Sequence, residues 1–151
     1  MAMQKVAIGT VLAVALVGMV AIALSASLLT ASRTLPNSGN VKAVGVGVYW
    51  DSSCTNETST INWGTLAPNS TKNVMLYIKN NGTVAVTLSM ATSGWNPAGA
   101  ASYLTLNWNC TNYNLYHGNV VTAYLTLSVS PSVSGITSFS FDITITGTES
   151  T

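Results

Sequence analysis

From Val41 onward, apolar residues recur at almost every second position of the chain. The clearest case is residues 120–130, where Val121, Ala123, Leu125, Leu127 and Val129 alternate with Thr, Tyr and Ser. A period of two places side chains on one face of a β-strand, whereas an amphipathic helix needs a period of 3.6. The pattern predicts seven strands, at residues 41–50, 61–64, 73–80, 84–91, 103–109, 120–130 and 136–146. We therefore expect an all-β domain over residues 40–151, an immunoglobulin-like or jelly-roll β-sandwich.

Turn residues separate these segments. Asn80-Asn81-Gly82 predicts a tight hairpin because Asn and Gly tolerate positive φ, and further turns are expected at 67–70, 96–97 and 130–132. The domain also contains four tryptophans: Trp50, Trp63, Trp95 and Trp108. We expect them to pack in the core and at its edges. The alternative, an aromatic sugar-binding platform, would need rings on one exposed face with polar side chains between them.

The N-terminus is hydrophobic. Residues 1–5 carry one positive charge, and no charged residue follows from Val6 to Ser32. Residues 1–26 therefore read as a signal peptide, with small residues favouring cleavage between Ala23 and Ser27, or as a retained hydrophobic helix long enough to span a membrane. In both cases the remaining chain is expected outside the cytoplasm, secreted or held at the cell surface.

Charge is scarce throughout. Only 6% of the residues are charged and the net charge is +1, while Thr, Ser and Asn make up 52 of the 151 residues. A nucleic-acid partner is not expected because it would require a basic face, and membrane contact is expected only through the signal or anchor segment. The four carboxylates are scattered, His117 is the only histidine, and no catalytic or metal-ligand motif occurs. We expect neither enzymatic activity nor a cofactor or metal.

Two kinds of covalent modification are expected in an exported chain. The chain has an even number of cysteines, Cys54 and Cys110. A single disulfide between them is therefore favoured over two free buried thiols or a metal site. Four Asn-x-Ser/Thr sequons, at Asn56, Asn69, Asn81 and Asn109, predict N-glycosylation, most of all at the first three.

Residues 27–39 (SLLTASRTLPNSG) lie between the hydrophobic segment and the sandwich. They are too polar to span a membrane and predict an extended strand, ended by Pro36 and an Asn-Ser-Gly turn. Such a strand could be a tether, an extra strand of its own sandwich, or a strand lent to a neighbouring subunit. The residues expected to fill a neighbour's pockets are Leu28, Leu29, Ala31, Arg33 and Leu35.

Four stretches carry a resemblance to a known family: Val46–Trp50 with Asp51, Ile61–Pro68, Tyr77–Gly82 and Phe139–Ile143. In this order the chain resembles the archaeal bundling-pilus subunits, which are similar to the bacterial TasA/camelysin biofilm-fibre proteins. The resemblance implies an extracellular filament that polymerises head to tail by donor-strand complementation, with residues 27–36 as the donor. It also implies copies of the same chain as partners, together with other filaments or cell surfaces.

Two other functions are open at this point. One is an archaeal type IV pilin, in which the hydrophobic helix is kept in the filament core. The other is a membrane-anchored, immunoglobulin-like binding domain at the cell surface.

Overall fold

The computed structural model describes residues 37–151, so the predicted signal or anchor (1–26) and most of the predicted donor strand lie outside the described residues. The elements in chain order are β1 (Ser38–Val44), β2 (Gly47–Tyr49), β3 (Thr60–Asn62), β4 (Thr71–Lys79), β5 (Val86–Asn96), the short 3-10 helix η1 (Ala98–Ser102), β6 (Leu104–Trp108), β7 (Asn114–Leu115), β8 (Val120–Val129) and β9 (Ser140–Glu149). Within this region no helix has the length and apolar character to cross a membrane.

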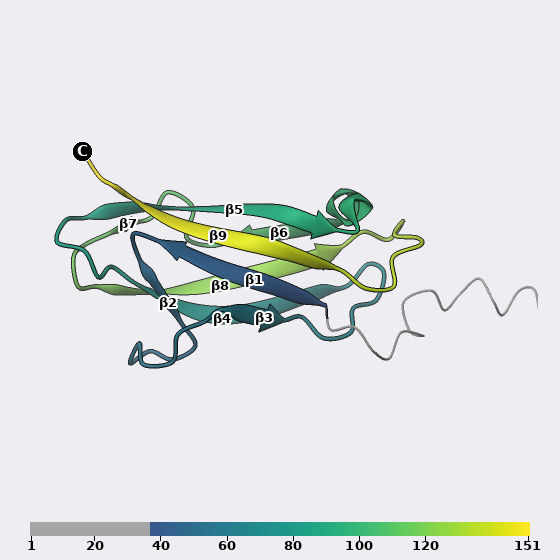
Figure 1. Cartoon of the computed structure of the whole chain (residues 1–151), viewed down its shortest axis with the longest axis horizontal. Coiled ribbons are helices and arrows are strands. Elements are labelled where there is room, and N and C mark those ends of the chain that lie inside the picture. The colour runs from purple at the N-terminus through teal and green to yellow at the C-terminus, as the bar shows by residue number, and fades with distance from the viewer. Residues whose placement is uncertain (1–36) are drawn as a thin grey trace, which may run out of the picture.

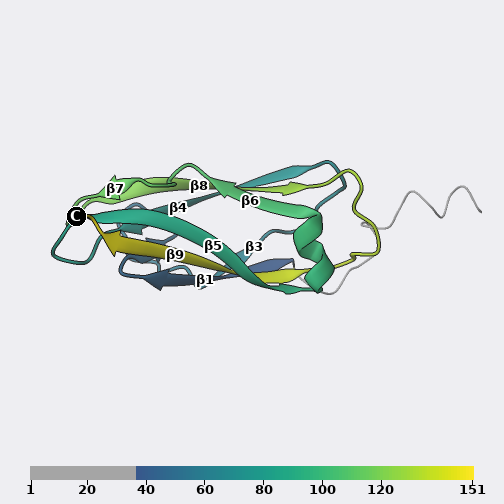
Figure 2. The same cartoon turned by 90° about the horizontal axis from the view of Figure 1, so that it is seen from above.

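The strands form two sheets packed face to face, so the predicted all-β sandwich is confirmed. One sheet has the order β3-β1-β9-β5-β7 and the other the order β2-β4-β8-β6. Figure 1 shows the elements in place, and Figure 2 shows the two layers edge-on with η1 spanning them at one end. We call them the five-stranded and the four-stranded sheet. Pairing is antiparallel except between β1 and β9, which run parallel over seven residues.

The core lies between the sheets and follows the predicted alternation. In β9 the side chains of Phe141, Ile143 and Ile145 are buried, as are those of Leu125 and Leu127 in β8. Inward positions of both sheets therefore supply the apolar area whose burial stabilises the fold.

Aromatic rings gather at one end of this core. The Phe141 ring stacks on Trp95, with 4.1 Å between ring centroids, and lies 6.4 Å from Trp63. Trp63 is fully buried, Trp95 and Trp108 are half-buried, and Trp50 is exposed. Three of the four tryptophans therefore pack in the core or at its edges, as predicted, and Trp50 does not.

The predicted strand at 41–50 is two strands in different sheets. β1 belongs to the five-stranded sheet and β2 to the four-stranded sheet. The chain crosses at Gly45, whose φ is +73° and where a Cβ would lie 2.6 Å from the carbonyl oxygen of Gly147. Only glycine accommodates that backbone and that approach without strain. Together with the unpredicted two-residue β7, this division gives nine strands within residues 37–151 instead of the seven predicted.

The predicted Asn80-Asn81-Gly82 hairpin is wrong. β4 pairs with β2 and β8, whereas β5 lies in the other sheet, so residues 80–85 cross between the layers. Asn80 is fully buried; its Nδ2 donates to the carbonyls of Val84 (2.7 Å) and Leu115 (2.9 Å), and its Oδ1 accepts from the N–H of Gly82 (2.9 Å). Asn80 is therefore a satisfied polar anchor of the crossing.

The predicted Asn-Ser-Gly turn at 37–39 is also wrong, because β1 begins at Ser38. Asn37 is buried at the start of β1. Its Nδ2 donates to the carbonyl of Gly64 (2.9 Å), and its Oδ1 accepts from the N–H of Phe139 (3.1 Å). These bonds fix the point at which the chain enters the sandwich, so the domain boundary falls before residue 40.

Candidate functional site

The longest strand of the sandwich, β5, lacks a neighbour along most of one edge. β9 pairs with it over nearly its whole length, but β7 on the other side pairs only with Val86 and Thr87. Among the described residues, no strand lies beyond β5 from Ser89 to Asn96. We call this stretch the β5 edge. An unpaired edge offers backbone N–H and C=O groups to an added strand.

The direction of the free backbone groups follows from Leu88. Its N–H donates to the carbonyl of Tyr113 (2.9 Å), and its carbonyl accepts from the N–H of Asn112 (3.0 Å), so both point away from β9. Backbone direction alternates along a strand, so Met90 and Thr92 point their N–H and C=O groups the same way. Neither has a backbone partner on that side within residues 37–151.

The core is also incompletely covered beside the β5 edge. Met90 is paired with Ile145, and Thr92 with Ile143, so both point into the sandwich. Met90 is nevertheless half-buried and Thr92 exposed, whereas Ile143 and Ile145 are fully buried.

The core is also incompletely covered at the facing edge of the four-stranded sheet. Its edge strand β6 places Leu106 and Trp108 inward, opposite buried residues of β8, and both are only half-buried. Within residues 37–151, the inner surface along the β5–β6 side therefore lacks the side chains that would complete it.

The opposite side of the sandwich is partly covered. There β3 and β2 are short edge strands, but the segment after β3 folds over the gap. Trp63 is fully buried and Leu66 is 4% exposed, and Val48 and Ile61 beside them are also buried. Ala43 and Val74, which are paired with fully buried residues and therefore point inward, are nevertheless exposed and half-buried on this side. The β5–β6 side is distinguished by the length of its unpaired edge, from Ser89 to Asn96 in the described sandwich.

The chain enters the domain at the η1 end of this open side. Ser38 is paired with Ser140, and Ser140 with Asn96, so the start of β1 and the end of β5 share one end of the sheet. η1 follows there and lies between the sheets (Figure 2). The described chain therefore begins at this end, two strand positions away from β5.

The predicted donor residues Leu28, Leu29, Ala31, Arg33 and Leu35 lie outside the described residues. The acceptor was not predicted, although the sequence of β5 holds a signal for it. Its inward positions change from Leu88 and Met90 to the polar Thr92, before the register shift between Ser93 and Asn96 turns Trp95 onto Phe141. A polar residue at an inward position between Met90 and Trp95 marks where the core is left open.

The predicted disulfide is wrong: Cys54 and Cys110 are free thiols. Cys54 follows β2 and Cys110 follows β6, and these strands form opposite edges of the four-stranded sheet. Three strand spacings of about 4.8 Å separate the edges by roughly 14 Å, whereas a disulfide needs Cα atoms within about 7 Å. Cys110 is buried, its Sγ lies 3.7 Å from the carbonyl oxygen of Thr122, and burial raises the pKa of its thiol.

The four sequon asparagines are all exposed but differ in their surroundings. Asn69 lies at a turn with φ +57°, as predicted, and Asn56 lies in the β2–β3 loop. Asn81 donates from Nδ2 to the Tyr49 hydroxyl (3.2 Å). Both ends of the Asn109 amide are used: Nδ2 donates to the carbonyl of Thr122 (3.3 Å), and Oδ1 accepts from the N–H of Tyr124 (2.8 Å). Glycosylation at each of them stays a prediction.

The scattered titratable groups have local structural partners. Asp51 accepts from the N–H groups of Asn56 (2.7 Å) and Thr55 (3.0 Å), which lowers the pKa of its carboxyl group. His117 Nδ1 bonds with the carbonyl of Gly82. Within residues 37–151, no three His, Cys, Asp or Glu side chains gather in a geometry that could hold a metal ion.

Comparison with known proteins adds no identity. No family model matches the chain, and no curated protein matches it significantly. The resemblance to bundling-pilus and TasA-like subunits therefore remains a prediction from the sequence, and the β5 edge is the structural feature on which a function can be proposed.

Proposed function

We propose that this chain is the structural subunit of an extracellular filament, in which residues 27–36 of one copy pair with the β5 edge of the next copy. The observation that carries the proposal is the open edge itself, where free backbone groups at Met90 and Thr92 lie beside inward side chains that remain partly exposed. An inserted strand would satisfy the backbone and complete the core in one step.

The proposed donor has the length and pattern that such an edge requires. Ten residues in extended form span about 33 Å, more than the roughly 20 Å covered by the six residues Ser89–Gly94. Leu29 and Leu35 share one face of an extended strand because they are six positions apart, an even number. Each leucine would contribute roughly 1.5–3 kcal/mol when buried, and each new backbone hydrogen bond about 0.5–1.5 kcal/mol.

The geometry favours insertion into another copy over insertion into the same domain. From the start of β1, a strand beyond β5 is three strand spacings away, or roughly 14 Å. Crossing that distance within the same domain uses about four of the ten residues, and the path must pass η1. A neighbouring copy can use all ten residues for pairing. This contact is head-to-tail, so it does not close on itself and propagates into a filament.

The test uses a variant that lacks residues 27–36. We expect it to remain monomeric by electron microscopy and light scattering, whereas the mature chain forms fibres. A synthetic peptide of residues 27–36 should bind the deletion variant and raise its melting temperature. A peptide with Leu29 and Leu35 replaced by Asp is the control and should not bind. Fibres formed by the deletion variant would contradict the donor role.

The acceptor is tested with Thr92→Pro. The N–H of Thr92 points away from β9, so proline there removes no ladder bond within the domain but obstructs an added strand. In the deletion background we expect a melting temperature close to that of the parent and at least a tenfold loss of peptide affinity. Peptide binding that is unaffected by Thr92→Pro would place the donor at a different edge.

N-terminal sequencing of the exported protein separates this proposal from the two alternatives. A start near residues 24–28 agrees with a donated strand. A start before residue 10 would favour a type IV pilin with a retained helix, and an uncleaved N-terminus would favour a membrane-anchored binding domain.

A further inference from the structure

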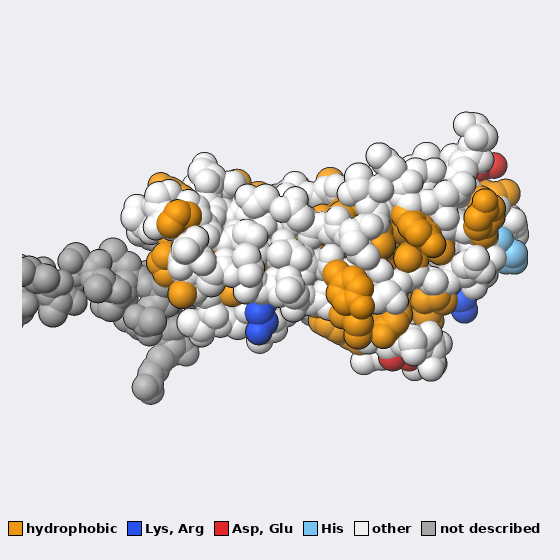
Figure 3. All heavy atoms as spheres, turned by 180° about the vertical axis from the view of Figure 1, so that it is seen from behind, with side chains coloured by type: hydrophobic (Ala, Val, Ile, Leu, Met, Phe, Trp, Pro, Cys, Tyr) orange, Lys and Arg blue, Asp and Glu red, His pale blue; other side chains and the backbone are white. Residues whose placement is uncertain are grey.

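The outer face of the four-stranded sheet carries a group of large side chains that the filament proposal does not use. Tyr49 of β2, Met75 and Tyr77 of β4, and Tyr124 of β8 all point outward, opposite to the buried residues of their strands. Tyr124 is 51% and Met75 44% exposed. We call these four residues the tyrosine patch. Figure 3 shows hydrophobic side chains gathered on this face, over the half of the molecule farther from the start of β1.

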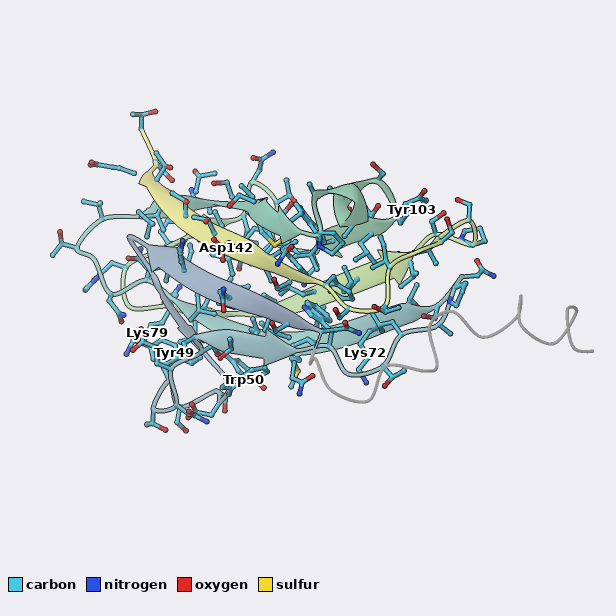
Figure 4. The ribbon with its side chains drawn as sticks, turned by 45° about the vertical axis from the view of Figure 1, so that its right-hand side comes forward. Tyr49, Trp50, Lys72, Lys79, Tyr103 and Asp142 are labelled. Carbon is cyan, nitrogen blue, oxygen red and sulfur yellow. The ribbon has the colours of Figure 1, made fainter. Side chains whose placement is uncertain are left out.

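Strand register brings the patch together. Tyr49 is paired with Tyr77 across β2 and β4, and Met75 with Tyr124 across β4 and β8. Directly paired side chains on one face of an antiparallel sheet lie about 5 Å apart at Cβ. Two adjacent cross-strand rows therefore form one continuous surface. Trp50 directly follows Tyr49 and is 38% exposed, and Figure 4 shows the two residues on the same side of the molecule.

Gly47 sets how the Tyr49 ring lies. A Cβ at residue 47 would be 2.6 Å from Cε2 of that ring, so the ring covers the bare Cα of Gly47, which also points outward. The absence of a side chain lets the ring rest against the sheet. The Tyr49 ring therefore lies against the outer surface of the sheet.

Polar, mostly uncharged side chains surround the patch. The next outward row holds Asn73, Thr126 and Asn107 in register. The Tyr124 hydroxyl makes no hydrogen bond with another side chain of the described region. The charged neighbours are of both signs: Lys79, paired with Gly47, Glu57, bridged to Tyr49, and Asp51, directly after Trp50. A surface with this charge balance does not select a polyanion or a polycation.

The size of the patch argues against a stable contact with a second copy. At roughly 200 Å² for a fully exposed large side chain, the four residues with Trp50 expose roughly 300–400 Å². A stable protein interface takes about 800 Å² from each partner. Patches of a few hundred Å² on a monomer often mark ligand sites.

We infer that the tyrosine patch binds a neutral polysaccharide. Aromatic faces would stack on the C–H faces of sugar rings, while the tyrosine hydroxyls and the neighbouring Asn and Thr side chains would bond to sugar hydroxyls. An apolar protein partner would leave those polar groups without partners, at a cost in free energy. The structure thus supplies the exposed rings with polar surroundings that a sugar platform needs, mainly from tyrosines and not from the tryptophans. This inference is independent of the filament proposal, because the patch is formed within one domain.

The experiment measures co-sedimentation of the purified full chain with microcrystalline cellulose, chitin powder and insoluble starch. We expect saturable binding to at least one of the three. Tyr124→Ala should weaken that binding at least about fivefold, and Gly47→Ala should weaken it by displacing the Tyr49 ring. Tyr116→Ala is the matched control, because Tyr116 is 62% exposed but lies in the β7–β8 loop, and its affinity should stay within twofold of the parent chain.

Melting temperatures check that each variant is folded. The inference would be overturned if the parent chain sedimented with none of the three polysaccharides. It would also be overturned if Tyr124→Ala and Tyr116→Ala lost polysaccharide affinity equally. If Tyr124→Ala instead abolished self-association in sedimentation velocity while no polysaccharide bound, the patch would be a contact between copies. Failure of the donor-strand deletion test would leave this result unchanged, so the two proposals can be rejected separately.

Discussion

Replacing Asn80 by alanine is the sharpest test of how the two sheets are joined. Its amide is fully buried and holds the β4–β5 crossing to the carbonyl of Leu115 in β7. The same side chain bonds to the carbonyl of Val84 and the N–H of Gly82. Alanine removes all three bonds and leaves a small void in place of the amide. Because β7 limits the β5 edge, the change also loosens one boundary of the proposed acceptor.

The expected loss in free energy of unfolding depends on how buried each former hydrogen-bond partner of Asn80 is. Leu115 is 2% exposed, so its carbonyl stays without a partner, at about 1–3 kcal/mol. Val84 and Gly82 are exposed and can bond to water, so each lost bond there costs at most about 1 kcal/mol. We therefore expect Asn80→Ala to lower the free energy of unfolding by about 2–4 kcal/mol.

Urea denaturation followed by tryptophan fluorescence measures this difference. With a denaturant dependence of about 2 kcal/mol/M for a domain of this size, the midpoint should fall by roughly 1–2 M. Asn81→Ala is the matched control, because that side chain is exposed and makes one hydrogen bond, to Tyr49. Its effect should stay within about 0.5 kcal/mol. Equal midpoints for the two variants would refute the role given to Asn80.

Three further predictions concern the cysteines, acid stability and the aromatic core. The melting temperature should be the same with and without reductant, and a thiol reagent should label Cys54 in the native protein but Cys110 only on unfolding, because Cys110 is 1% exposed. Bonds from the Asn40 amide and from the Lys42 ammonium (3.3 Å) lower the pKa of Asp142 below its ordinary 3.8. The folded state then binds fewer protons than the unfolded state, so this contribution is complete above about pH 4 and is lost as the pH falls through the folded pKa. When the melting temperature is measured from pH 6 to pH 2, it should accordingly fall less for Asp142→Asn than for the parent. Phe141→Ala should cost about 3–5 kcal/mol and weaken the near-ultraviolet circular dichroism of the tryptophan stacked on it; an unchanged spectrum would contradict the stacking.

The sequence predicted the sandwich because period-two alternation depends only on which face of a strand is buried. Strands β8 and β9 follow the predicted pattern, with Leu125 and Ile143 at its centre. The same pattern concealed the division between β1 and β2, because alternation continues when a strand leaves one sheet for the other. Only Gly45 marked the crossing, and a single glycine within a strand pattern is equally typical of a β-bulge or of a close backbone approach.

The features that the sequence did not predict depend on distances through space. Cys54 and Cys110 suggested a pair because sequence order does not show that their strands lie at opposite edges. Asn80 was assigned to a turn because the residue type alone does not show whether an asparagine is buried and fully hydrogen-bonded or exposed. The open β5 edge required the complete strand order, since an edge is defined by the strand that is absent beside it.

The parallel pairing of β1 with β9 has a mechanical consequence. The first and last strands are neighbours, in register from Ser38 with Ser140 to Val44 with Thr146. Because they run in the same direction, the start of β1 and the end of β9 lie at opposite poles of the domain (Figure 1). Tension applied between those poles pulls the two strands past each other and loads the whole ladder of bonds at once, in shear. Bonds loaded together resist far more force than bonds peeled apart one by one, so a domain with this pairing withstands stretching along its long axis.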